Sequence, residues 1–417
     1  MSRPPARSAG AAALLGASLM LLALNLRPLF PSLSVLLPEI TQALDMRGST
    51  AGYLTTLPVL CMGLFAPLAP WLGQRIGTER TLFIVLVLIG AGTALRGAGG
   101  LWALFLGTAL GGAGIALGNV LLPSIVKRDF ASRAALMTGL YTMSLVGGAA
   151  LAAAATLPLT HALDGSWGRG LAIWALVALV ALAAWTPFAL RAGPRGARGR
   201  LLPVVGLRRD PLAWTVTLFM GLQSSLAYCV LGWLAPILRA RGLDGTEAGL
   251  VVSLSILVEV AACLLTPLIA TRSRDQRILC AALTFAATVA LLGLLFGPRW
   301  TIWPWAAVQG IGQGGLFAVA MTIIVLRSPD SHVAAHLSGM AQATGYVLAA
   351  GGPLLVGVLH QWSGSFETTS WLFGTLGLLT GWAGWHAGRD RLVRARAVGG
   401  PAAAGEARPA PAAAGRP

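Results

Sequence analysis

Residues 16–38 read GASLMLLALNLRPLFPSLSVLLP, an apolar run interrupted near its middle by one cation, Arg27. The run is long enough to cross a hydrocarbon core of about 30 Å as a helix. An arginine guanidinium keeps its proton in proteins, so within a membrane it must face a protein interior or a watery cavity. The stretch therefore predicts a membrane helix that carries a site for an anion.

Similar apolar runs recur along the whole chain of 417 residues, of which 56% are hydrophobic and 11% charged. This pattern excludes an ordinary soluble domain and predicts an all-α polytopic membrane protein. The first run continues well past a signal-peptide core of about 7–15 residues, so we expect it to be retained. Twelve transmembrane helices are predicted, at 11–38, 49–72, 80–97, 101–126, 134–158, 170–190, 211–238, 247–270, 278–297, 301–326, 335–358 and 367–387.

The Gly- and Arg-rich stretch 191–210 is predicted to be a cytoplasmic linker between two six-helix halves, residues 1–190 and 211–388. The low-complexity end of the chain predicts a disordered cytoplasmic tail over 389–417. A displacement of 200 positions aligns Gly112 with Gly312 and Gly114 with Gly314, which indicates a duplicated unit. Transporters built from such repeats bind substrate near the membrane midplane between the halves and rock to alternate access.

The formal net charge of +16 indicates topology here, because short cytoplasmic loops of membrane proteins retain Lys and Arg. With the N-terminus inside, 23 of the 30 basic residues fall in cytoplasmic segments and six, Arg96 among them, fall outside; Arg27 is the remaining one. Both termini are therefore expected in the cytoplasm of a multi-pass protein of the cell (inner) membrane. The basic loops require no nucleic-acid partner, and a monomer in the lipid bilayer is expected.

Two ionisable residues are predicted to lie deep in the spans, Arg27 and Glu259. For Arg27 the alternatives are a structural ion pair and recognition of an anionic or strongly polar substrate, which suits the planar guanidinium. For Glu259 they are a structural hydrogen bond or ion pair, proton coupling, and substrate contact. Pro28 and Pro31 remove helix hydrogen bonds beside Arg27 and predict a broken helix at the midplane.

Neutral polar residues within the spans form a second group of candidates for a shared polar cavity, although interhelical hydrogen bonds would also explain each of them. They are Asn25, Asn119, Tyr141, Gln223, Tyr228, Gln309, Gln313, Gln342 and Tyr346. The histidines fall at predicted helix ends without partners suited to catalysis, and the cysteines lack metal-ligand spacing. We therefore expect no enzyme, no metal and no cofactor.

At these residues the chain resembles the cyanate and 2-nitroimidazole transporter branch of the major facilitator superfamily, over nearly all of residues 21–389. The similarity rests on Asn25-Leu-Arg27-Pro28, on 118–130 (GNVLLPSIVKRDF), on Gly221-Leu-Gln223-Ser224 with Tyr228, and on 338–346 (SGMAQATGY). It implies a twelve-helix transporter of small polar molecules that works by alternating access.

The superfamily's loop between helices 2 and 3 usually carries an Asp-Arg-x-Gly-Arg-type motif that contributes to conformational switching. The corresponding residues here are Gln74, Arg75, Gly77 and Arg80. Gln74 replaces the motif's acidic residue, and Glu79 is the candidate to take its place.

The sequence thus predicts a secondary active transporter of a small polar or anionic solute, such as cyanate or another small organic anion, that is proton-linked. Arg27 is the expected substrate anchor and Glu259 the leading coupling residue. The alternative within transport is export of drug-like neutral heterocycles such as nitroimidazoles. The alternatives from other classes are a polytopic membrane enzyme and a non-transporting sensor.

Overall fold

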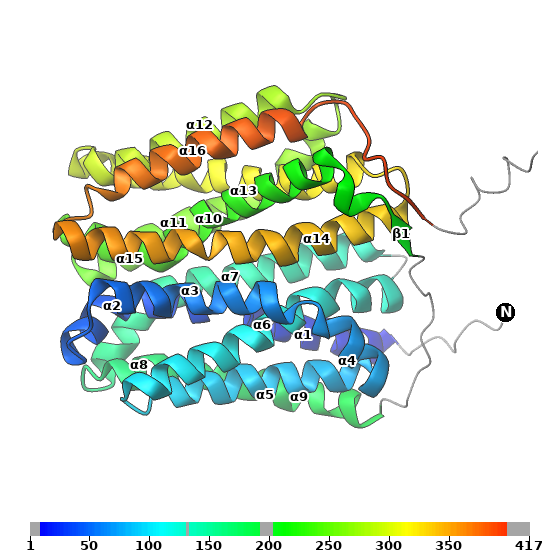
Figure 1. Ribbon diagram of the computed structural model, residues 1–417. Coiled ribbons are helices and arrows are strands. Elements are labelled where there is room, and N and C mark those ends of the chain that lie inside the picture. The colour runs from blue at the N-terminus through cyan, green and yellow to red at the C-terminus, as the bar shows by residue number, and fades with distance from the viewer. Residues whose placement is uncertain (1–8, 131–132, 192–202, 398–417) are drawn as a thin grey trace, which may run out of the picture.

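The computed structural model describes residues 9–130, 133–191 and 203–397, and within them the chain is almost wholly helical. The helices run roughly along one axis and form two bundles, one from each half of the chain (Figure 1). The long, apolar and nearly all-helical segments follow from the need to satisfy every backbone polar group within a membrane segment.

The first half contains nine helices among the described residues: α1 (Ala9–Leu24), α2 (Leu29–Ala43), α3 (Gly48–Phe65), α4 (Leu68–Ile76), α5 (Thr78–Arg96), α6 (Leu101–Asp129), α7 (Ala134–Ala162), α8 (Trp167–Ala172) and α9 (Trp174–Arg191). The second half contains α10 (Pro211–Ala240), α11 (Gly245–Ala270), α12 (Arg277–Phe296), α13 (Ile302–Leu326), α14 (Ser331–Ala349), α15 (Gly351–Ser363) and α16 (Thr369–Ala387). The described chain also contains two short 3-10 turns, Leu207–Arg209 and Arg299–Thr301, and two strands, β1 (Val204–Val205) and β2 (Arg396–Ala397).

Ten helical stretches of the described chain are long and apolar enough to cross a membrane, or eleven if the bent pair α3 and α4 is counted as one. The helix α16, with 19 residues, is long enough to be one further span, although its Gly, Thr and Trp content makes it less apolar than the others. This arrangement agrees with the twelve predicted segments and with a multi-pass membrane protein.

The first span is broken at residues 25–28, as predicted. At the break the backbone N–H of Asn25 donates to Leu22 O at 3.1 Å and that of Leu26 to Ala23 O at 3.0 Å, a tighter turn than an α-helix makes. Pro28 caps α2 with φ −54°, and neither Pro28 nor Pro31 has an N–H to continue the ladder. The break places Arg27 outside both helices in the middle of the span.

We call the end of the bundle where α9 ends and α10 begins the linker end, and the opposite end the far end. Several hydrogen bonds between the two halves lie from the helix middles to the far end. Thr56 Oγ1 donates to Ala350 O at 3.2 Å, and Ser49 N donates to Gln361 Oε1 at 2.8 Å. Arg239 pairs with Glu39 at 2.6 Å. The halves are therefore in direct contact from the helix middles to the far end.

At the linker end, each half is tied by one arginine that follows its fourth span. Arg128 Nη2 lies 2.8 Å from Glu79 Oε1 at the start of α5, and Trp185 of α9 donates to Glu79 O at 2.9 Å. In the second half Arg327 bonds to Gln276 before α12 and donates to Gly388 O, just after α16, at 3.0 Å. The two halves thus use one arrangement, which supports the internal repeat.

Glycine packing shows that the repeat register predicted within the fourth span is not exact. A Cβ on Gly112 would lie 2.8 Å from Pro58 Cα of α3, and one on Gly114 2.9 Å from Ile89 Cγ1 of α5. In the second half Gly310 faces the equivalent helix α11, and Gly312 faces α12. The expected pairing of Gly112 with Gly312 and of Gly114 with Gly314 is therefore wrong, because the paired glycines face different neighbours.

Two further expectations need correction. Arg96 is counted among the outside basic residues, at the end of the predicted span 80–97, but its side chain at the end of α5 is fully buried, at 0% exposure. The tail does not begin at residue 389, because Val393 is buried and β2 pairs with β1 in an antiparallel ladder. Residues 398–417, for which disorder is expected, lie outside the described residues. The same is true of residues 192–202, which make up most of the predicted linker.

Candidate functional site

Arg27 projects from the break in the first span, where no helix hydrogen bonding constrains it. Its side chain is half-buried, and its Nε is buried without a hydrogen-bond partner. Within the described chain its guanidinium makes no hydrogen bond and no salt bridge. A charged group held this way has its donors available to a ligand.

The groups that interact electrostatically with Arg27 all come from the other half of the chain. They are Tyr228 of α10, Glu259 and Cys263 of α11, and Tyr346 of α14. Arg27 therefore lies at the contact between the halves, and the predicted residues Arg27, Tyr228, Glu259 and Tyr346 come together there. We call these four residues the central cluster.

Aromatic rings line one side of the central cluster. The rings of Phe30 and Tyr228 have centroids 5.3 Å apart, and Tyr228 packs edge-on against Tyr346 at 6.1 Å. The Tyr228 hydroxyl donates to Met62 Sδ at 3.3 Å, across the two halves. Sequence reasoning missed Phe30, Met62 and Cys263, because apolar residues in a membrane helix resemble packing residues; the one available signal was that Phe30 follows Arg27 by three positions.

Glu259 reaches the cluster from α11, which packs closely against α13. A Cβ on Gly314 would lie 2.9 Å from both Cα and Cγ of Glu259, so only glycine allows this approach. Cys263 Sγ donates to Gly314 O at 3.2 Å, one turn further along α11. Ser255 and Thr266 of α11 are buried, as the predicted inward face requires.

The predicted glutamines form a buried network inside the second half. Gln313 Nε2 donates to Gln223 O at 3.2 Å and to Gln223 Oε1 at 3.3 Å. Gln223 Nε2 donates to Ser224 Oγ at 2.8 Å, and Ser255 Oγ donates to Gln309 Oε1. These bonds connect α10, α11 and α13, so they fix the helices that present Tyr228 and Glu259.

Within the described chain no hydrogen bond joins the remaining predicted residues to the Arg27 side chain. Asn25 Nδ2 donates to Leu21 O at 2.7 Å and to Val177 O at 3.4 Å, which turns it toward α9. Gln342 donates to Ser338 Oγ at 2.9 Å on its own helix. Asn119 and Tyr141 are half-buried on α6 and α7.

The loop between the second and third spans is organised by Gly77 and Glu79. Gly77 adopts φ +91°, which favours glycine, and separates α4, which carries Gln74 and Arg75, from α5, which carries Arg80. Arg75 lies 4.6 Å above the Trp71 ring. Burial acts to lower the pKa of Arg128, but the carboxylates of Asp129 and Glu79 more than offset it, so the pKa is raised.

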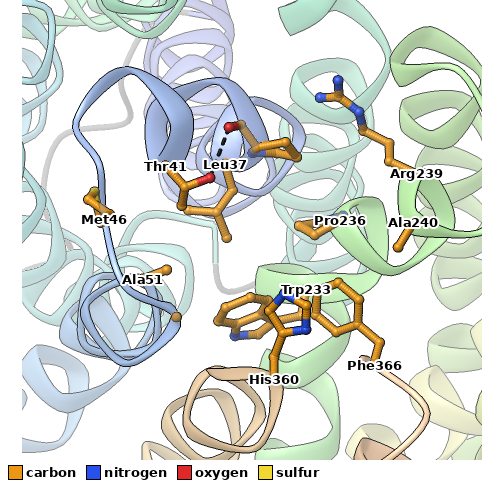
Figure 2. Close-up of a pocket in the computed structure, with 12 residues that line it drawn as sticks. Leu37, Thr41, Met46, Ala51, Trp233, Pro236, Arg239, Ala240, His360 and Phe366 are labelled. Atoms are coloured by element: carbon orange, nitrogen blue, oxygen red, sulfur yellow. Dashed lines mark hydrogen bonds between the residues drawn. The ribbon is translucent and has the colours of Figure 1, made fainter. Parts of the chain in front are cut away.

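A cavity of about 460 Å³ lies at the far end between α2, α3, α10 and α15 (Figure 2). Trp233, His360 and Phe366 form its aromatic side, and the rings of His360 and Phe366 stack at 3.9 Å. Arg239, on its rim, is the residue that pairs with Glu39 across the halves. The cavity contains no residue of the central cluster.

Comparisons with known proteins agree with this architecture. The family model described as Major Facilitator Superfamily matches residues 13–306 and 228–413. The 2-nitroimidazole transporter of Escherichia coli (strain K12) is 40% identical over 91% of this chain and 96% of its own length. The Cyanate transport protein CynX of the same organism is 34% identical over 86% of this chain and 92% of its own.

Among solved structures, a D-xylose-proton symporter has a similar fold at a TM-score of 0.73, with 15% sequence identity. The match covers 92% of this chain and 99% of that one. At this identity the likeness concerns the fold alone.

Proposed function

The chain belongs to the Major Facilitator Superfamily and is a transporter rather than an enzyme, and on this premise we propose that it carries a small anion bound at Arg27. The proposed substrate is cyanate or another small organic anion, moved across the cell membrane by alternating access. The coupling ion is the proton.

The observation that carries this proposal is the guanidinium of Arg27, which makes no hydrogen bond and no salt bridge among the described residues and lies where the halves meet. A fixed structural ion pair would occupy the guanidinium donors permanently. A small anion can instead accept two charge-assisted hydrogen bonds from the guanidinium edge. Residues 25–28 interrupt the helix, so the anion also lies near the N-terminus of α2, where the helix dipole is favourable.

A neutral nitroheterocycle is the second candidate substrate, because the rings of Phe30, Tyr228 and Tyr346 lie beside Arg27. A planar heterocycle can stack against such rings, and the two oxygens of a nitro group lie in a plane like those of a carboxylate. The relative named as a 2-nitroimidazole transporter fits this candidate.

Proton coupling is proposed to run through Glu259, which interacts electrostatically with Arg27 across the halves. The positive charge of Arg27 favours the ionised carboxylate. An anion bound at Arg27 cancels much of that field, so Glu259 takes up a proton more readily when substrate is present. Anion and proton would then move together.

Alternating access also has support in the positions of the contacts between halves. The Glu39–Arg239 pair and the Ser49–Gln361 bond are at the far end, which we assign to the extracellular side from the distribution of basic residues. In this assignment the described conformation is closed toward the outside, and the 460 Å³ cavity is an outer vestibule. Both termini are then cytoplasmic, and the chain works as a monomer.

Thermal-shift measurements on the purified protein test the substrate class. Sodium cyanate should raise the melting temperature of the wild type, since a ligand that binds only the folded state stabilises it. The rise should be absent in Arg27→Ala and retained in Arg169→Ala, an exposed arginine that serves as the matched control. Chloride is held constant throughout.

A cyanate-dependent rise that persists in Arg27→Ala would refute binding at Arg27. If 2-nitroimidazole raises the melting temperature and cyanate does not, the substrate is the neutral heterocycle and not the anion.

A further inference from the structure

A second guanidinium, that of Arg96, is buried inside the first half and has no partner. The side chain is 0% exposed, and Nε, Nη1 and Nη2 are all buried without a hydrogen bond. No ionisable group among the described residues interacts with it electrostatically. A charge in a low-dielectric interior that lacks both water and a counter-charge is strongly disfavoured.

The surroundings of Arg96 form a small polar cavity rather than a wholly apolar core. The cavity measures about 10 Å³, and its lining includes Arg96 and Thr93 of α5, Asn25, Pro28 and Ser32 on the first span, and Trp174 of α9. Thr93 is 5% exposed, and its hydroxyl makes no hydrogen bond within the described chain. Guanidinium and hydroxyl donors therefore border one enclosed space.

The shape of the neighbouring helices explains how the guanidinium is accommodated. Arg96 is in the last turn of α5, and a Cβ on Gly107 of α6 would lie 2.9 Å from its Cγ, so glycine leaves room for the arginine stem. The Trp174 indole already donates to Thr156 Oγ1 at 3.0 Å and is not free to bind a ligand. The free donors at the cavity are those of Arg96 and the Thr93 hydroxyl.

We propose that this cavity binds a single-atom anion of the chloride class as the counter-ion of Arg96. About 10 Å³ leaves room for one small species, which excludes a linear or planar polyatomic anion, and a halide, being larger than water, is accommodated only if the cavity widens slightly on binding. The cavity is thus distinct from the site at Arg27, although Pro28 borders it. The bound anion is held by the two donors of α5 and lies against α2 and α9 behind the helix break, so that it neutralises the buried charge beside the segment that presents Arg27.

The melting temperature of the purified protein tests this proposal when gluconate is exchanged for chloride or bromide at constant ionic strength. We expect a saturable rise of about 2 °C or more in the wild type. The rise should vanish in Arg96→Met, where an apolar side chain of similar length removes the need for a counter-ion. Arg169→Met, which alters an exposed arginine near the same end, should respond like the wild type.

Two measurements keep the test decisive if Arg96→Met does not fold. Thr93→Val leaves the charge in place and removes one donor, so it should shift the halide titration to concentrations several-fold higher. Crystals grown in bromide should show an anomalous peak beside the Arg96 guanidinium. No halide dependence in the wild type, an unchanged response in both variants, or no bromide peak would overturn the proposal and leave water as the occupant.

Discussion

Individual side chains at the contact between halves define the proposed chemistry. Arg27 supplies a fixed positive charge, and Glu259 is an acid in the other half that interacts with it. The assignment of coupling to Glu259 rests on this pairing across a boundary that moves during alternating access. If it is correct, the binding and coupling functions can be separated by mutation.

We predict that Glu259→Gln abolishes accumulation driven by a pH gradient while substrate exchange continues. Glutamine mimics the protonated carboxyl, so the variant cannot alternate between charged and neutral forms. Accumulation and exchange are measured in proteoliposomes with and without an imposed gradient. Glu247→Gln, in the first turn of the same helix, should behave like the wild type.

Continued gradient-driven accumulation by Glu259→Gln would mean that the proton takes another route. Loss of folding would instead point to a structural role for the carboxylate.

The sequence predicted the central residues better than their orientations. Arg27, Tyr228, Glu259 and Tyr346 could be recognised because a polar group deep in an apolar span is conspicuous. The direction of the Asn25 side chain could not be predicted, because the helix break changes which way each residue of the span faces. Its amide donates to Val177 O and so points toward α9. Arg96 was missed because a residue at a predicted helix end is indistinguishable from one in a loop until packing is known.

At the scale of helices, the sequence located the spans to within a few residues, as for 80–97 against the observed Thr78–Arg96. It also predicted the break at Pro28, because the missing proline N–H is a local property. It did not predict which helices touch. The close approach of α11 to α13 at Gly314 depends on the tertiary arrangement, and so does the register of the repeat.

The α11–α13 contact makes a specific prediction for Gly314→Ala. The added Cβ would lie 2.9 Å from Cα of Glu259, so α11 must shift and change the position of the carboxylate relative to Arg27. We expect a loss of stability of about 1–3 kcal/mol, typical of overpacking, together with weaker proton coupling. The two effects are measured by thermal unfolding and by pH-gradient-driven uptake.

Gly339→Ala is the matched control for this substitution. No atom lies within 4 Å of its added Cβ, and alanine favours the helix, so neither property should decline. A Gly314→Ala protein with wild-type coupling would show that the position of Glu259 is not critical.

For the whole molecule, the linker-end ties lie within each half and the far-end contacts join the two halves. Arg128 with Glu79 and Arg327 with Gln276 stabilise each half internally, whereas Glu39–Arg239 crosses between them. Partly exposed pairs contribute only about 0–1 kcal/mol each, so the far-end closure can open during the cycle. The orientation of the protein in the membrane determines from which side that opening admits substrate.

We predict the orientation from cysteine accessibility in a variant that lacks Cys61, Cys229, Cys263 and Cys280. A cysteine at exposed Arg208, at the linker end, should resist an impermeant thiol reagent added to intact cells. A cysteine at exposed His161, at the far end, should react. Permeabilised cells, in which both must react, provide the control, and the reverse pattern in intact cells would invert the proposed topology.

The central claim is that Arg27 recognises a transported anion through the geometry of its guanidinium. Uptake of radiolabelled cyanate into proteoliposomes that contain only this protein, driven by a proton gradient, tests it most directly. The account predicts uptake by the wild type and about a tenth of that rate or less for Arg27→Lys, because an ammonium keeps the charge but cannot form the paired hydrogen bonds. Equal uptake by Arg27→Lys, or wild-type uptake no greater than that of protein-free liposomes, would contradict it.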